Sequence, residues 1–184
     1  MKETEHPIRW TYEDYLLLPD DGKRYEIIRG EKFMSAAPIP KHQIVSMKLI
    51  RVVDHWVEAN KLGICLYAPI DVVLADDSVV QPDIIFIRKD RMGIIGEKAI
   101  TAAPDFVIEI LSDSTRKLHL VLKRNLYASY GVREYWIVDP KAERIDIYIL
   151  EKDELVKKVE ITEGEARSLA VLPGLAIPLR EVFA

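Results

Sequence analysis

The stretch FVIEIL at residues 106–111 contains one carboxylate, Glu109, within an otherwise apolar run. A second apolar run, IIFI at residues 84–87, directly follows Asp83. Both runs are typical of buried strands, where an unpaired carboxylate costs several kcal/mol or becomes neutral. A divalent cation held between the two carboxylates would offset that cost, because Mg²⁺ is bound through one or two carboxylates together with waters and phosphate oxygens. Hydrogen-bonded carboxylates at two strand ends are the alternative, but the occurrence of two such residues favours a metal site.

The length and composition predict one domain over residues 1–184. A chain of this size buries about 70% of its unfolded surface, so it needs no cross-links for stability. The single cysteine, Cys65, excludes a disulfide framework and a cysteine-based zinc site, and it indicates a reducing compartment. Neither a leader nor a membrane span is expected, since a span needs about 18 consecutive apolar residues. We therefore expect a cytoplasmic protein.

The net charge of −4 argues against a protein that coats nucleic acid, because such binding depends on clustered Lys and Arg. A nuclease requires only a local basic channel and a metal ion. Two short basic runs, at residues 88–91 and 116–117, follow the stretches that carry the two carboxylates. Runs of this kind are most often solvated loop surface, so they do not establish such a channel.

Periodicity and capping residues predict two long helices and a short one. Apolar residues at helical spacing indicate a helix over 41–60. Capping side chains at 112–115, followed by a second apolar stripe that ends before Gly131, indicate the other long helix. The short helix is expected after Thr11, because Asp14 follows three residues later as in a capping box.

The predicted strands lie before and after the second long helix in the sequence. A hairpin is expected around Gly30, and further strands are expected at 64–67, 70–74, 83–88, 105–111, 134–138 and 144–149. The segment near Gly93 is predicted to be a loop, and residues 155–159 are predicted to form edge structure. A strand, a helix of about 15 residues and a strand with short links form the pattern of a parallel crossover connection.

The motifs of this chain occur in an order that is specific to one family. They are YEIIRGE at 25–31, Pro38 with HQ at 42–43, VQPD at 80–83, VIEILSDST at 107–115, Lys123 with YA at 127–128, EYW at 134–136 and VDP at 138–140. Over about residues 11–182 the chain resembles the Uma-type family of restriction endonucleases, which belongs to the PD-(D/E)XK nuclease superfamily. The resemblance implies an α/β (α+β mixed) fold with a restriction-endonuclease-like core. That core is a mixed β-sheet flanked by helices, with a divalent-metal phosphodiesterase site at one edge.

The resemblance also implies catalytic roles. Asp83 and Glu109 match the acidic residues of the superfamily pattern and would hold Mg²⁺ or Mn²⁺. The lysine that usually follows the second acid by two residues is replaced by Leu111. Lys123, in the following helix, matches the variant in which this lysine has migrated. It would stabilise charge on the phosphorus or orient the attacking water.

Helical spacing supports this assignment of Lys123 in part. His119, Lys123 and Tyr127 lie four residues apart and form one helical stripe, so Lys123 can point back toward the carboxylates. A lysine on a solvated helix face is the alternative. His119 and Tyr127 are further candidates to contact the substrate. The family usually has an aspartate where this chain has His119, and a histidine orients a lysine poorly, so a weakened site is expected.

Three further residues match positions of the family. Glu26, on a strand of the predicted hairpin, would supply another ligand or accept a proton, although pairing with Arg24 or Arg29 explains it equally well. His42 and Gln81 are candidates to contact the substrate or the metal-binding residues. Each is equally consistent with a hydrogen bond at the end of a helix or strand.

The sequence leaves more than one class of function open. The first is an endonuclease that hydrolyses DNA with Mg²⁺ or Mn²⁺, for which a homodimer is expected because two-fold dimers are the commonest assemblies. The second is a non-catalytic nucleic-acid-binding or assembly module that keeps the nuclease fold. Asp83, Glu109 and Lys123 together favour the enzyme, whereas the net acidity and His119 favour the module. A metal phosphatase acting on small phosphate esters, which needs no basic channel, is a third interpretation.

Overall fold

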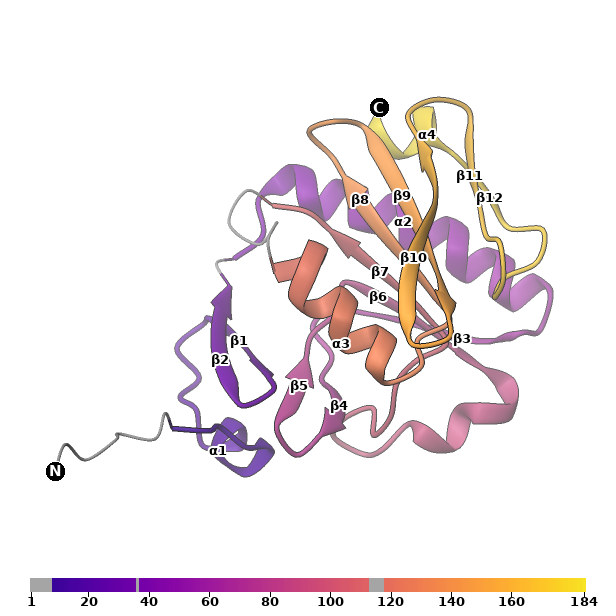
Figure 1. Cartoon of the computed structure of the whole chain (residues 1–184). Coiled ribbons are helices and arrows are strands. Elements are labelled where there is room, and N and C mark those ends of the chain that lie inside the picture. The colour runs from indigo at the N-terminus through magenta and orange to yellow at the C-terminus, as the bar shows by residue number, and fades with distance from the viewer. Residues whose placement is uncertain (1–7, 36, 113–117) are drawn as a thin grey trace, which may run out of the picture.

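The computed structural model describes residues 8–35, 37–112 and 118–184. Its central sheet consists of β3 (Gly63–Tyr67), β6 (Ile84–Arg88), β7 (Phe106–Ile110), β8 (Glu134–Asp139), β9 (Arg144–Glu151) and β10 (Glu154–Ile161). The strand order is β10-β9-β8-β7-β6-β3, with β7 and β8 parallel and the other neighbours antiparallel. The predicted mixed sheet flanked by helices is confirmed (Figure 1), and so is the parallel crossover between β7 and β8.

Two smaller sheets adjoin the central one. The larger of them consists of β1 (Arg24–Ile28), β2 (Glu31–Ser35), β4 (Val72–Ala75) and β5 (Ser78–Val80), and the smaller of β11 (Glu165–Arg167) and β12 (Ala176–Pro178). The order in the larger sheet is β2-β1-β5-β4. The predicted hairpin is confirmed, and its turn residues Arg29 and Gly30 have φ of 52° and 81°, as a two-residue hairpin turn requires. The three-residue strand β5 was not predicted because it is too short to show alternation.

The helices before β3 form where the capping and spacing signals predict them. In α1 (Tyr12–Leu16) the Thr11 side chain and the Asp14 side chain make the reciprocal bonds of a capping box. The long helix α2 (Pro40–Ala59) begins with proline at its first turn, where the missing N–H costs nothing. Its buried residues recur every three or four positions. These spacings give α2 one apolar stripe, which packs on the sheet.

The segment after β7 differs from the single α-helix that the sequence predicts. A π-helical segment, η2 (Leu118–Lys123), leads directly into α3 (Arg124–Ser129). Wide turns of this kind are frequently found at functional sites. The predicted caps at 113–115 and the basic pair at 116–117 lie outside the described residues. The predicted loop near Gly93 contains a 3₁₀ helix, η1 (Lys89–Ile94).

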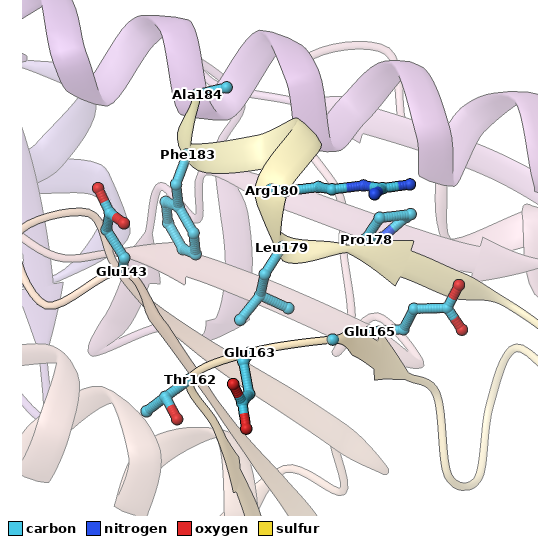
Figure 2. Close-up of a pocket in the computed structure, with 10 residues that line it drawn as sticks. Glu143, Thr162, Glu163, Glu165, Pro178, Leu179, Arg180, Phe183 and Ala184 are labelled. Atoms are coloured by element: carbon cyan, nitrogen blue, oxygen red, sulfur yellow. The ribbon is translucent and has the colours of Figure 1, made fainter.

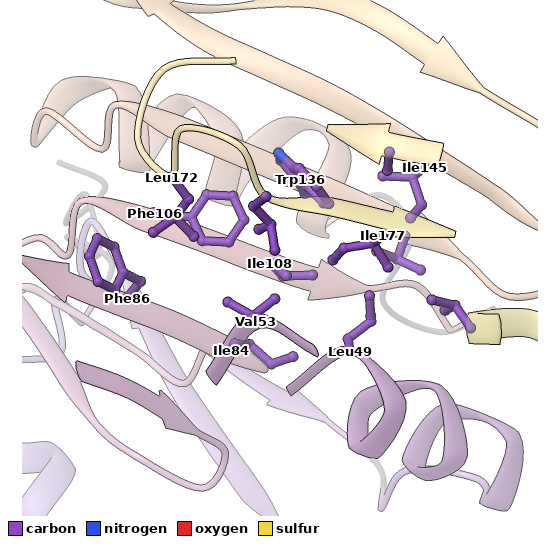
Figure 3. Close-up of a cluster of buried hydrophobic side chains, with 14 of the residues drawn as sticks. Leu49, Val53, Ile84, Phe86, Phe106, Ile108, Trp136, Ile145, Leu172 and Ile177 are labelled. Atoms are coloured by element: carbon purple, nitrogen blue, oxygen red, sulfur yellow. The ribbon is translucent and has the colours of Figure 1, made fainter. Parts of the chain in front are cut away.

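The central sheet separates two hydrophobic cores, because alternate residues of a strand point to opposite faces. On one face Ile84 and Ile108 pack against α2 (Figure 3). On the other face Ile85 and Val107 pack beneath α3. Glu109 follows Val107 at the same alternate spacing, so its side chain lies on the α3 side of the sheet.

The chain ends with the short helix α4 (Leu179–Phe183), which contacts α2. Cys65 is buried and is not part of a disulfide. Among the described residues, no helix is long and apolar enough to cross a membrane.

Candidate active site

The register of β6 and β7 brings the two predicted carboxylates together. Ile84 pairs with Ile108 in this antiparallel ladder, and continuing the register by one residue places Asp83 opposite Glu109. Residues opposite each other in such a ladder have Cβ atoms about 4.5–5.5 Å apart. The backbone N–H of Ile110 also donates a hydrogen bond of 2.8 Å to Asp83 Oδ2. The two acids therefore lie next to each other at the same end of two inner strands of the sheet.

Lys123 lies between two carboxylates from different sheets. Its side chain is inaccessible to solvent, and its Nζ is 2.8 Å from Glu26 Oε1 and 2.6 Å from Glu109 Oε1. Burial lowers the pKa of Lys123, but the two carboxylates outweigh burial and raise this pKa above its usual value. The structure therefore holds a charged ammonium group inside the protein, at the end of the π-helical segment.

Glu109 is surrounded by side chains that exchange protons. Tyr127 donates a hydrogen bond of 2.7 Å to Glu109 Oε1, and His119 Nδ1 is 3.2 Å from Glu109 Oε2. Burial raises the pKa of Glu109 to about 7; Lys123 opposes this shift, and the negative charge of Asp83 adds to it. In this setting, a cation beside Asp83 and Glu109 would stabilise the ionised form of both.

Asp83 has a partner from the long helix. His42 Nε2 lies 3.3 Å from Asp83 Oδ2, and both side chains are buried. Burial would raise the pKa of Asp83, but the hydrogen bonds from His42 and from the Ile110 N–H lower it. For His42 the effect of burial has the opposite sign and acts to lower its pKa. The neighbouring Asp83 outweighs burial, so the pKa of His42 is raised. His42 thus keeps Asp83 ionised.

The ammonium of Lys123 has two carboxylate neighbours, whereas His119 is uncharged. Burial, together with the charge of Lys123, lowers the pKa of His119 to about 3, so its imidazole is neutral. The lysine is held by Glu26 and Glu109. The weakened site expected from the missing aspartate stays a prediction, which the cleavage rate of a His119→Asp variant tests.

Glu26 is positioned by the backbone of the segment that precedes Asp83. The Gln81 N–H donates a hydrogen bond of 2.6 Å to Glu26 Oε1, and Lys123 Nζ lies 2.8 Å from the same oxygen. Within the described residues, Glu26 forms no ion pair with Arg24 or Arg29. The Gln81 side chain donates instead to Tyr15 Oη and to Asp71 Oδ1, at 3.1 and 2.8 Å. Sequence reasoning missed Tyr15 and Asp71: Asp71 interrupts the short apolar run at 70–74, but no motif marks either residue.

A cavity of about 290 Å³ opens at this cluster. Its lining includes Arg24, Glu26, His42, Asp83, Glu109 and Lys123. The basic run at 88–91 does not reach it: Arg88 is five residues beyond Asp83, which is roughly 16 Å along an extended strand. Its arginines pair with the buried carboxylate of Asp105. In the described part of the chain, Arg24 is therefore a basic side chain at the cavity, whereas the run at 88–91 supports another part of the fold.

The residues at the cavity fit a hard divalent cation. Glu109 Oε2 is buried and accepts no hydrogen bond within the described residues. Two carboxylates suit Mg²⁺ or Mn²⁺, which complete their shell with water and phosphate oxygens. The described residues contain no group of three or more His, Cys, Asp or Glu side chains placed to hold a metal ion, as a closed zinc site requires.

A larger cavity, of about 650 Å³, lies at the C-terminal helix (Figure 2). Glu143, Glu163 and Glu165 lie around it with Arg180. Its lining shares no residue with the cavity at Lys123, as far as the described residues show. The larger cavity contains none of the residues that the sequence predicts for the site, whereas Asp83, Glu109 and Lys123 all line the smaller one, so the smaller cavity is the candidate site.

The fold is that of a protein whose crystal structure is known. A crystal structure of a protein from Anabaena variabilis ATCC 29413, described as a putative nuclease belonging to DUF820, superimposes with a TM-score of 0.79 at 19% sequence identity. The match covers 94% of this chain and 97% of that chain. The sequence model of the Uma2 family, described as "putative restriction endonuclease", matches residues 12–180, so the chain belongs to that family. No curated protein matches the chain in sequence.

Proposed function

We propose that the protein is an endonuclease that hydrolyses DNA phosphodiester bonds with Mg²⁺ or Mn²⁺. The observation that carries this proposal is the buried ammonium of Lys123, held between Glu26 and Glu109 beside Asp83 in one cavity. A lysine this deeply buried is expensive to maintain. Charge arranged in this way stabilises negative charge on a reacting phosphate, and membership of the Uma2 family supports the same reaction.

Each residue has a separate role in the proposed reaction. Asp83 and Glu109 would hold the cation, and His42 keeps Asp83 ionised. Lys123 donates hydrogen bonds to the non-bridging oxygens of the scissile phosphate. Glu26 orients Lys123 and accepts a proton from the attacking water. When bound, the divalent ion supplies a more acidic water and neutralises developing charge.

A non-catalytic nucleic-acid-binding or assembly module is the second candidate. The net charge of −4 favours this candidate over an enzyme that acts on DNA. A protein can also keep the buried polar cluster of an enzyme fold without keeping its activity. This candidate requires binding without cleavage. The two candidates therefore differ in one measurable outcome.

The decisive experiment is a cleavage assay of the pure protein. Supercoiled plasmid, linear duplex and single-stranded DNA are each incubated with Mg²⁺ or Mn²⁺, with EDTA as the metal control. We expect cleavage that EDTA abolishes and that Lys123→Ala reduces. Lys98→Ala, which removes an exposed lysine, is the matched control and should cleave like the parent.

Two outcomes of this assay contradict the enzyme. Cleavage that persists equally in Lys123→Ala points to a contaminating nuclease. Metal-independent binding without cleavage, by parent and variant alike, supports the module. A homodimer and a cytoplasmic location are further parts of the proposal; sedimentation equilibrium and cell fractionation test them.

A further inference from the structure

A second groove adjoins the candidate site. It measures about 340 Å³ and is lined by one face of α2 and by the end of β3. Asp83 lines both this groove and the cavity at Lys123. Tyr67 pairs with Ile84, the residue after Asp83, and the Ala68 N–H donates to the Asp83 carbonyl oxygen at 2.9 Å. The groove therefore lies next to the proposed reaction centre, with Asp83 in the lining of both.

The groove combines an exposed aromatic ring with apolar and polar side chains. Tyr67 is 64% exposed, and Met47 of α2 is 44% exposed. Arg51 lies about one turn and Asp54 about two turns beyond Met47 on α2, and both line the same groove. Large exposed apolar side chains gathered beside a reaction centre indicate a binding surface. The mixture of a flat ring, a cation and hydrogen-bonding groups suits one nucleotide.

A nucleobase can stack on Tyr67 only when it is unpaired. In a duplex both faces of every internal base are covered by its neighbours, so a protein ring reaches a base in a single strand or after extrusion. Stacking of bases on aromatic side chains is the usual way in which proteins hold single strands, with cationic side chains on the backbone. Arg51 is placed to supply such a contact, and Asp54 to accept a hydrogen bond from an exocyclic amino group.

We propose that the groove formed by Tyr67, Met47, Arg51 and Asp54 binds an unpaired nucleotide of a DNA strand next to the phosphate that is cleaved. This proposal rests on the nuclease function and gives it a substrate class: single-stranded or locally unpaired DNA. The base stacks on Tyr67 against Met47, and Arg51 contacts the adjoining phosphate. Asp83 joins the groove to the reaction centre.

The first test measures binding in EDTA, where no cleavage takes place. A fluorescein-labelled 12-nucleotide single strand is titrated with parent, Tyr67→Ala, Tyr67→Trp and Tyr130→Ala proteins. Tyr67→Ala should weaken binding about 5- to 100-fold, the range found when one stacking ring is removed. Tyr67→Trp should retain binding, because indole stacks as well. Tyr130→Ala, which removes an exposed tyrosine at the end of α3, should bind like the parent.

The second test separates this proposal from the nuclease function. With Mn²⁺, the parent should cleave single-stranded DNA or a duplex with an unpaired bulge faster than a fully paired duplex, and Tyr67→Ala should lose that preference. Tyr67-dependent binding in a protein that cleaves nothing supports the groove and overturns the nuclease. Duplex cleavage without any preference, together with equal binding by parent and Tyr67→Ala, overturns the groove and leaves the nuclease. A change of oligomeric state in Tyr67→Ala, without a change in binding, also overturns it, because a second copy would then occupy the groove.

Discussion

Two glutamates of the central sheet, Glu109 and Glu134, are equally buried but have different kinds of partner. Both are inaccessible to solvent, and they lie in the neighbouring parallel strands β7 and β8. Glu134 accepts hydrogen bonds from Trp136 Nε1, from Ser168 Oγ and from three backbone N–H groups at 169–171. Glu109 faces Lys123, Tyr127 and His119, which all carry exchangeable protons.

The comparison shows that burial of a carboxylate does not by itself identify a reaction centre. Glu134 is saturated by neutral, mostly backbone donors, which tie the chain before β12 to the sheet. Glu109 keeps one oxygen without a hydrogen bond within the described residues, and burial raises its pKa to about 7. A group with spare coordination and a poised pKa can take part in chemistry, whereas a saturated group maintains the fold.

The largest expected effect concerns the stability contributed by Glu134. Glu134→Ala leaves its buried donors without an acceptor, and since each such loss costs about 1–3 kcal/mol, the free energy of unfolding should fall by about 3 kcal/mol or more. Glu109→Gln should change it by less than about 1 kcal/mol, because losing a repelling charge offsets the weaker contact with Lys123. Urea denaturation measures both. Equal losses in the two variants would show that Glu109 is also structural.

The next effect concerns the cleavage rate and Lys123. Lys123→Ala should lower the rate by about 10²- to 10³-fold, which is about 2.7–4 kcal/mol, as when one preorganised stabilising group is deleted. Affinity for Mn²⁺ should stay within a few-fold. Lys123→Arg should not restore the rate, since a planar guanidinium does not replace a compact ammonium.

Lys123→Met controls for packing, because it keeps most of the side-chain volume without the charge. Thermal melting of each variant shows whether it is folded. A folded Lys123→Met protein that cleaves at the parent rate would exclude a role for the ammonium.

Metal affinity gives a smaller effect. Asp83→Ala and Glu109→Ala should each weaken Mn²⁺ binding tenfold or more, at least about 1.4 kcal/mol, in calorimetric titration. Glu134→Gln is the matched control: it alters a buried glutamate in the adjacent strand and should bind Mn²⁺ like the parent. Unchanged affinity in both carboxylate variants would place the cation elsewhere.

The smallest effect is expected at His119. Replacing it by aspartate, as the family resemblance suggests, should change the cleavage rate by less than about tenfold, or about 1.4 kcal/mol, because Lys123 already has two carboxylate partners. Single-turnover cleavage measures this. A larger gain that disappears in the Lys123→Ala background would mean that residue 119 does orient the lysine, contrary to the geometry described above.

The sequence by itself determined the elements whose signals are local. Helical spacing defined α2, the Thr11 and Asp14 pair defined α1, and the apolar runs defined β6 and β7. The motif order around Asp83 and Glu109 indicated the family. These features could be predicted because periodicity, capping and strand composition act between residues close in the chain. The short strand β5 and the π-helical segment carry no such signal and were missed.

Only the tertiary structure decided how the site is assembled. Lys123 and Glu26 come from segments almost a hundred residues apart. Their contact requires the four-stranded sheet that contains β1 to pack beside the α3 face of the central sheet. The strand register places Asp83 opposite Glu109, and it also sets Tyr67 beside Asp83 at the mouth of a groove. Sequence named most of these residues and pointed Lys123 toward the carboxylates, but it did not show that Glu26 pairs with Lys123 or His42 with Asp83. The reason is that the energy of a buried charge depends on the groups that folding brings within a few ångströms of it.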